Sequence, residues 1–127
     1  MNSSILKTFS DILQSRLSDA DETGCKIYNG PIKKSGATQY GIIRKTINHV
    51  PYEFYAHRIA KMAAMNCTTI EPPLQCSHLC HNSLCCNPEH IVLETQTINN
   101  NRIFCKNFQY CTGHTDINGK ALPNCIF

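Results

Sequence analysis

The chain reads CSHLCHNSLCCNPEHIVLE from Cys76 to Glu94, and the order of ligand-type residues in this stretch decides the fold that we expect. Cys80, Cys85 and His90 recur in it at five-residue intervals around an Asn-Pro turn. Such spacing can place three soft ligands around one tetrahedral Zn²⁺ ion. A fourth ligand has to come from elsewhere, and Cys25 is the best placed, just after Gly24. The first expected zinc site therefore comprises Cys25, Cys80, Cys85 and His90, and it leaves Cys67, Cys76 and Cys86 as candidates for buried thiols.

A second group of ligand-type residues lies near the end of the sequence. Gaps of six residues, three residues and a longer insertion separate its members, which suits a closed structural site with four ligands. The segment around it is rich in turn-forming residues and poor in apolar ones, so a metal would have to provide its folding free energy. The second expected zinc site comprises Cys105, Cys111, His114 and Cys125.

The composition favours one small domain held by metal. A chain of 127 residues is too short for two independent cores. Its nine cysteines are odd in number and mixed with histidine, which indicates zinc; the alternative, a disulfide-rich secreted protein, predicts folding without zinc. Lys7, Ser10 and Asp11 interrupt the N-terminal apolar residues, so we expect no signal peptide and an intracellular protein, nuclear or cytoplasmic. No stretch is apolar enough to span a membrane.

Hydrophobic periodicity predicts the first elements. Apolar residues at helical spacing over residues 4–18 predict an amphipathic helix capped by Ser3 or Ser4, within an N-terminal unit of residues 1–20. Residues 21–127 are expected to form a single domain. Short antiparallel strands are expected at Cys25–Gly30, Gln39–Ile47 and Pro51–Tyr55, with a Lys-Lys-Ser-Gly loop between the first two, followed by a short buried helix over residues 56–65.

The segment between the two expected zinc sites predicts a strand, a loop, a second strand and a helix. The first strand carries His78, the second is IVLET, and Thr95 or Thr97 can cap the helix. Three consecutive asparagines, residues 99–101, are poor helix formers, which indicates that at least one has a functional role. In this ββα arrangement the histidine and an asparagine can converge on one cavity.

The stretch SHLCHNSLCCNPEHIVLETQTINNNRIFC, from Ser77 to Cys105, resembles the His-Cys box of homing endonucleases, a branch of the ββα-metal or HNH-like nucleases. Gly24-Cys25, Tyr40-Gly41 and Ala56-His57-Arg58 recur in such domains, so the resemblance covers roughly residues 24–125. It implies an α+β fold in which a small antiparallel sheet and a ββα-metal nuclease motif are held by two structural zincs. It also implies a magnesium-dependent endonuclease that hydrolyses phosphodiester bonds of double-stranded DNA.

The resemblance assigns roles to individual residues. His78 would be the general base that activates water, and Asn99 would hold the catalytic Mg²⁺. The two zinc sets would be the ones given above. An arginine on the sheet would neutralise the scissile phosphate; Arg44 is the favoured match and Arg58 its competitor, while His57 is expected to be structural.

Basic residues are concentrated in the predicted hairpin region, where Glu53 is the only acid. They favour a DNA-binding surface, with a solvated sheet face that binds nothing as the alternative. If DNA is the substrate, the residues expected along its phosphates are Lys33, Lys34, Arg44 and Lys45.

Two features depart from the resembled pattern. The spacing from His114 to Cys125 is longer, and the chain lacks the long C-terminal tail with which the resembled enzyme embraces its partner in a homodimer. Dimerisation and double-strand cleavage are therefore left open, as is nicking by a monomer. The main alternative function is a non-catalytic zinc-dependent module that binds DNA.

Overall fold

The first helix, α1 (Ser3–Gln14), begins one residue before the predicted start. The computed structural model describes all residues 1–127. Asn2 caps α1, because its side-chain oxygen accepts a hydrogen bond from the backbone N–H of Ile5 at 2.8 Å, so the prediction of Ser3 or Ser4 as the cap was wrong. The helix also ends earlier than predicted, and Leu17 instead forms an isolated antiparallel bridge with Tyr28.

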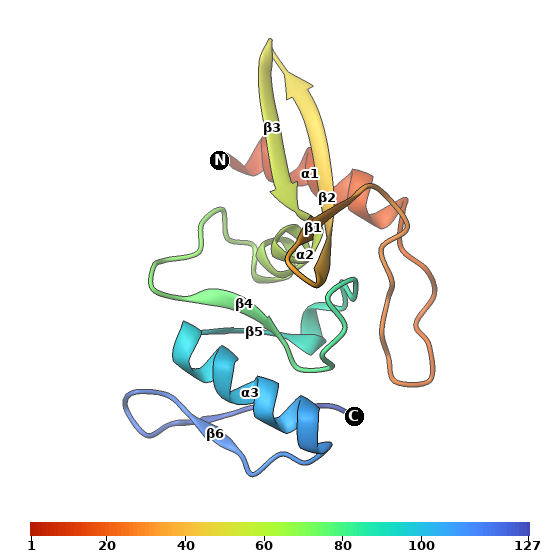
Figure 1. Cartoon of the computed structure of the whole chain (residues 1–127). Coiled ribbons are helices and arrows are strands. Elements are labelled where there is room, and N and C mark those ends of the chain that lie inside the picture. The colour runs from red at the N-terminus through yellow and green to blue at the C-terminus, as the bar shows by residue number, and fades with distance from the viewer.

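Three strands form the larger antiparallel sheet, in the order β1 (Ile32–Ser35), β2 (Thr38–Ile47) and β3 (Val50–Tyr55). The end of β2 and the start of β3 project as a hairpin beyond the rest of the molecule (Figure 1). Asn48 and His49 turn the chain at its tip with φ angles of 50° and 64°, a conformation that asparagine tolerates better than most residues.

The predicted strand at Cys25–Gly30 was wrong, and the predicted Lys-Lys-Ser-Gly loop is largely β1. Cys25 and Tyr28 are buried by loop packing, so their apolar character imitates a strand. All residues of β1 are exposed, including the apolar Ile32, so no alternation of apolar and polar residues marked it as a strand. Pairing with β2 defines it instead.

The apolar core lies between α1, the hairpin and α2 (Ala56–Met65), the short helix predicted from residues 56–65. Phe9 of α1 packs edge-on against Phe54 with ring centroids 4.9 Å apart. The core takes little from the C-terminal half, where only Cys86 and Ile91 join its fully buried cluster.

The C-terminal half contains the predicted ββα arrangement. β4 (Gln75–His78) pairs antiparallel with β5 (Ile91–Glu94), the 3₁₀ turn η1 (Pro88–His90) precedes β5, and α3 (Gln96–Phe108) follows it. Thr95 occupies the N-cap position of α3, but its side chain makes no capping hydrogen bond. A two-stranded ribbon, β6 (His114–Thr115) and β7 (Ala121–Leu122), lies beyond α3. The fold is α+β, as expected.

None of the helices combines the length and the apolar character that crossing a bilayer requires.

Candidate metal centres and active site

The four residues of the first expected zinc site come together although Cys25 lies 65 residues before His90. The ligand atoms of Cys25, Cys80, Cys85 and His90 all lie within 4.8 Å of one another. Nδ1 of His90 is 3.6 Å from Sγ of Cys25 and 3.7 Å from Sγ of Cys85. A tetrahedral zinc with ordinary Zn–S and Zn–N bonds separates such atoms by about 3.6 Å. The donor set and its spacing fit Zn²⁺.

Two side chains that the sequence analysis missed hold the loops of this first centre. Oδ1 of Asp21 accepts the backbone N–H groups of Thr23 and Cys25, both at 2.9 Å, and so shapes the turn that presents Cys25. Nδ2 of Asn87 donates to the carbonyl of Gly24 at 2.7 Å, which joins that turn to the His90 loop. The Asp-x-Thr-Gly and Asn-Pro turns were signals in the sequence that could have identified both residues.

The second expected set also converges. Cys105 at the buried side of α3 meets Cys111, His114 and Cys125 with all ligand atoms within 4.8 Å of one another. Here it is Nε2 of His114 that faces the sulfurs, at 3.4 Å from Cys105 and 3.7 Å from Cys125. These distances again match tetrahedral zinc. Cys125, whose spacing departs from the resembled pattern, therefore lies within the group.

The thiols of the first centre lie close enough to change one another's pKa. A hydrogen bond with the Cys80 thiol lowers the pKa of Cys85 to about 4, and the same contact raises the pKa of Cys80. One negative charge is thus easily accommodated, whereas further thiolates so close together would repel one another. A divalent cation removes that repulsion, which is the chemical reason for expecting a metal here.

His78 lies at the end of β4, directly beside the first centre. Its Nε2 is 2.9 Å from the carbonyl oxygen of Cys85. A carbonyl only accepts hydrogen bonds, so Nε2 carries the proton and Nδ1 is left as a free base. Burial lowers the pKa of His78, which favours the neutral imidazole. The backbone of a metal-ligand residue thus fixes the tautomer of the expected general base.

The model of one protein family, the zinc-binding loop region of homing endonucleases, matches residues 24–127. The chain belongs to this family. The match includes both metal centres and His78, and it leaves out residues 1–23, which contain α1. No curated protein is significantly similar to the chain.

Asn99 of this homing-endonuclease zinc-binding region lies in the first turn of α3, the helix that packs beside β4 and β5 (Figure 1). It is half-buried, and its side chain makes no hydrogen bond within the chain. The neighbouring Asn100 is exposed, and its side-chain oxygen accepts from Gln96. Of these two residues, Asn99 has the free carboxamide oxygen that a hard cation requires.

The hairpin separates the four expected DNA-binding residues into two pairs. Arg44 lies opposite Glu53 in the β2–β3 register, and its Nε donates to that carboxylate at 2.7 Å. Nζ of Lys33 donates to the other oxygen of Glu53 at 3.2 Å. Lys33, Arg44 and Glu53 therefore share one face.

Lys34 and Lys45 lie on the other face of the sheet, since side chains alternate along a strand. Lys45 is opposite Tyr52, whose ring contacts Phe9 of α1. The four residues expected along DNA phosphates therefore do not share one face of the hairpin, because consecutive residues of a strand point to opposite sides of the sheet.

A row of aromatic rings connects the Arg44 face of the sheet to His78. Tyr40 and Tyr55 lie on that face with ring centroids 5.3 Å apart. The ring of His57 is 5.7 Å from Tyr55 and 4.8 Å from His78. The hairpin and β4, which are distant in the sequence, therefore border one continuous region of the molecule.

His57 is buried, in agreement with the expectation that it is structural. Its Nδ1 has no hydrogen-bond partner, and burial, together with the neighbouring His78 and Arg58, lowers its pKa to about 3. The charge of Arg58 also reaches Cys76 of β4, where it counteracts the effect of burial on the thiol pKa. Arg58 therefore lies near the His78 strand, while Arg44 is fixed by Glu53 on the hairpin.

Sequence reasoning also missed a buried ion pair. The guanidinium of Arg102 on α3 makes a two-pronged contact with Glu94 at the end of β5, with distances of 2.7 and 2.9 Å. Both side chains are almost wholly buried. Glu94 and Arg102 are eight residues apart, on a strand and on a helix, so no local spacing in the sequence predicted their contact.

Proposed function

We propose that this protein is a magnesium-dependent DNA endonuclease of the His-Cys box branch of the ββα-metal nucleases. One observation carries the proposal: the hydrogen bond from Nε2 of His78 to the carbonyl of Cys85, which leaves Nδ1 as a base at the end of a ββα strand. Membership of the homing-endonuclease zinc-binding family supports a role on DNA.

The reaction is hydrolysis of a phosphodiester bond. Nδ1 of His78 takes a proton from a water molecule as that water attacks phosphorus, and the bond to the leaving 3′ oxygen breaks. The Nε2 hydrogen bond keeps the ring oriented and accommodates the positive charge that the ring gains. A magnesium ion, when bound, supplies charge stabilisation to the phosphate and the leaving oxygen. The half-buried side chain of Asn99 would hold that ion through its carboxamide oxygen.

The two zincs have structural roles in this proposal. Four protein ligands fill the coordination sphere of each, so neither has an open position for water. Cys85 is both a ligand of the first centre and the hydrogen-bond acceptor of His78. The first zinc therefore acts on the chemistry by holding the residue that orients the base.

Double-stranded DNA is the proposed substrate, and the hairpin face with Lys33 and Arg44 is its proposed binding surface. Glu53 binds Nε of Arg44, so the other two nitrogens of the guanidinium remain for phosphate oxygens. We keep Arg44 as the proposed phosphate-neutralising residue, because the row of aromatic rings connects its face with His78. Arg58 remains its competitor.

The test is nicking of supercoiled plasmid with Mg²⁺ by wild type and by His78→Ala. Loss of a general base lowers the rate by about 10²–10⁴-fold. The matched control is His81→Asn, which removes another histidine near the first metal centre. Position 81 has a φ of 60°, a conformation that asparagine tolerates. Zinc content of all three proteins is measured by elemental analysis, so that loss of activity is not confused with loss of metal.

We expect wild type and His81→Asn to nick and zinc-replete His78→Ala to fail. A monomer would release nicked circles, whereas a homodimer would release linear DNA. The ratio of the two products therefore also indicates the oligomeric state. Zinc-loaded wild type that binds varied DNA but leaves it intact contradicts the nuclease proposal and favours a non-catalytic zinc-dependent binding module.

A further inference from the structure

Arg102 makes two polar contacts in addition to its ion pair with Glu94. Besides its two bonds to Glu94, its Nη2 donates to the carbonyl of Pro123 at 3.0 Å, and its Nη1 donates to Sγ of Cys125 at 3.3 Å. The side chain is 2 % exposed. Burying a guanidinium is costly unless every donor direction is used, so these contacts define its position closely.

The contacts of Arg102 join two parts of the chain, the ββα unit and the C-terminal segment. Glu94 belongs to β5, and Arg102 to α3, whereas Pro123 and Cys125 belong to the segment after β7. That segment has three other anchors outside the metal centre. The backbone N–H of Ile126 donates to the carbonyl of Leu79 at 2.8 Å, that of Cys125 reaches Sγ of Cys111 at 3.4 Å, and the ring of Phe127 stacks on His81. Arg102 is therefore, beside the shared metal centre with Cys105 of α3, a direct side-chain link from the ββα unit to Cys125.

A donor directed at the sulfur of a metal ligand is a common way for residues around a metal site to orient its ligands. A charged N–H group stabilises the thiolate form, which is the form that binds metal, and fixes the direction of the sulfur. The bidentate contact with Glu94 in turn fixes the guanidinium, because a planar fork on a carboxylate allows one orientation.

We propose that Arg102 is a positioning residue that fixes Cys125 in the second metal centre and, through Glu94, ties that centre to β5 and α3. Glu94, Arg102 and Cys125 form one polar network that runs from the ββα unit to the second metal centre. Asn99 lies one turn before Arg102 on α3, so the contacts of Arg102 also fix the helix that carries the proposed magnesium ligand. This second consequence rests on the proposed function.

Three variants test the proposal. Arg102→Lys keeps a positive charge beside Glu94 but cannot reach Glu94, Pro123 and Cys125 at once. The double variant Glu94→Gln with Arg102→Gln removes both charges, so that no lone buried charge unfolds the protein. Lys106→Gln is the matched control, because it removes a cation one turn further along α3 from an exposed position without contact to Cys125.

Each protein is titrated with a zinc chelator, and the cysteines that become reactive are identified by alkylation and mass spectrometry. We expect Arg102→Lys and the double variant to bind the second zinc about 10–100-fold more weakly than wild type. Cys111 and Cys125 should become reactive at chelator concentrations at which Cys80 and Cys85 are still protected. Lys106→Gln should behave as wild type.

Wild-type affinity for the second zinc in both Arg102 variants would overturn the proposal. So would simultaneous release of both zincs in both variants, because that result indicates a general folding role with no selective effect on Cys125. The consequence for Asn99 is read separately, as a higher Mg²⁺ concentration for half-maximal nicking by Arg102→Lys. If wild type does not nick DNA, the proposed function fails, and the zinc titration still decides the role of Arg102.

Discussion

The protonation state of a single histidine links the metal centres to the proposed chemistry. His78 receives its orientation from the carbonyl of Cys85, a backbone group whose place depends on the first metal centre. A side-chain partner could rotate away, whereas a carbonyl next to a metal-ligand side chain is held by the fold. The proposed base would thus be oriented before any substrate binds.

His57 allows a pH test at the residue scale. Its folded-state pKa of about 3 lies below its ordinary value, so below about pH 6.5 the unfolded chain binds a proton that the folded chain excludes. The free energy of unfolding therefore decreases as pH falls. We predict that wild type loses about 1 kcal/mol more stability than His57→Phe between pH 6.5 and 5.5.

Denaturant unfolding at the two pH values, with zinc saturating, measures this difference. Phenylalanine keeps the ring against Tyr55 and His78 and adds no unpaired nitrogen in place of Nδ1. Equal losses of stability in the two proteins would show that the His57 site is not responsible for any acid sensitivity.

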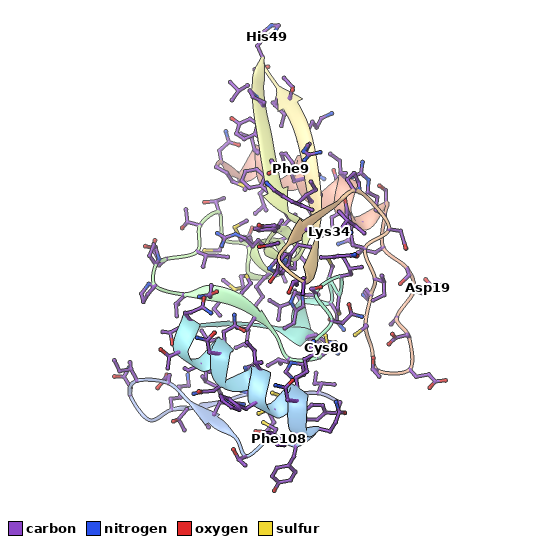
Figure 2. All side chains as sticks on the ribbon, in the orientation of Figure 1. Phe9, Asp19, Lys34, His49, Cys80 and Phe108 are labelled. Carbon is purple, nitrogen blue, oxygen red and sulfur yellow. The ribbon has the colours of Figure 1, made fainter.

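At the scale of elements, the hairpin and the ββα unit are separate pieces that meet at the row of aromatic rings. Figure 2 shows His49 at the hairpin tip and Phe108 of α3 at the opposite end of the molecule, with Cys80 of the first metal centre between them. A DNA backbone lying along the Arg44 face of the hairpin would therefore continue toward His78.

The alternation of side chains on the hairpin predicts unequal effects of its lysines on DNA binding. Lys33→Gln removes a cation from the Arg44 face, while Lys45→Gln removes one from the face turned toward α1. Loss of one phosphate contact reduces the slope of log Kd against log salt by about 0.9. We predict that reduction for Lys33→Gln and a smaller one for Lys45→Gln, measured by fluorescence anisotropy on a DNA duplex. The reverse order would place the DNA on the α1 side.

At the scale of the whole molecule, the two metal centres differ in the part of the chain that they are placed to stabilise. The apolar core contains residues of α1, α2 and the hairpin, together with Cys86 and Ile91 near the first centre. No residue of the C-terminal segment after α3 belongs to it. Large apolar residues there, such as Ile117 and Tyr110, are exposed. We therefore expect folding of that segment to depend on the second centre and on Arg102.

We predict that Cys111→Ser, which removes a ligand of the second centre, leaves the core intact. Hydrogen exchange measured by mass spectrometry should show loss of protection over residues 109–127 and unchanged protection in α1 and α2. Cys85→Ser is the comparison, because its centre joins the Cys25 turn to the core, and it should lower protection in both halves of the chain. Retained protection at residues 109–127 in zinc-depleted Cys111→Ser would contradict this division.

The sequence by itself determined the features that depend on local chemistry and spacing. Helical periodicity predicted α1 and α2, and alternation predicted β2 and β3 to within a few residues. The soft ligands at short intervals predicted two metal centres, because thiol and imidazole groups in such patterns have few other uses. The ββα order followed from the same reasoning, and the family match over residues 24–127 agrees with it.

Only the tertiary structure decided what depends on contacts between distant residues. It closed Cys25 onto ligands 55 to 65 residues away, replaced the predicted strand at Cys25–Gly30 with β1, and gave the lysines of the hairpin different faces. It also buried Arg102 against Glu94 and Cys125 and set the tautomer of His78 through a carbonyl. Backbone carbonyls and buried ion pairs leave no periodic pattern in a sequence, because what specifies them is the packing of whole elements against one another.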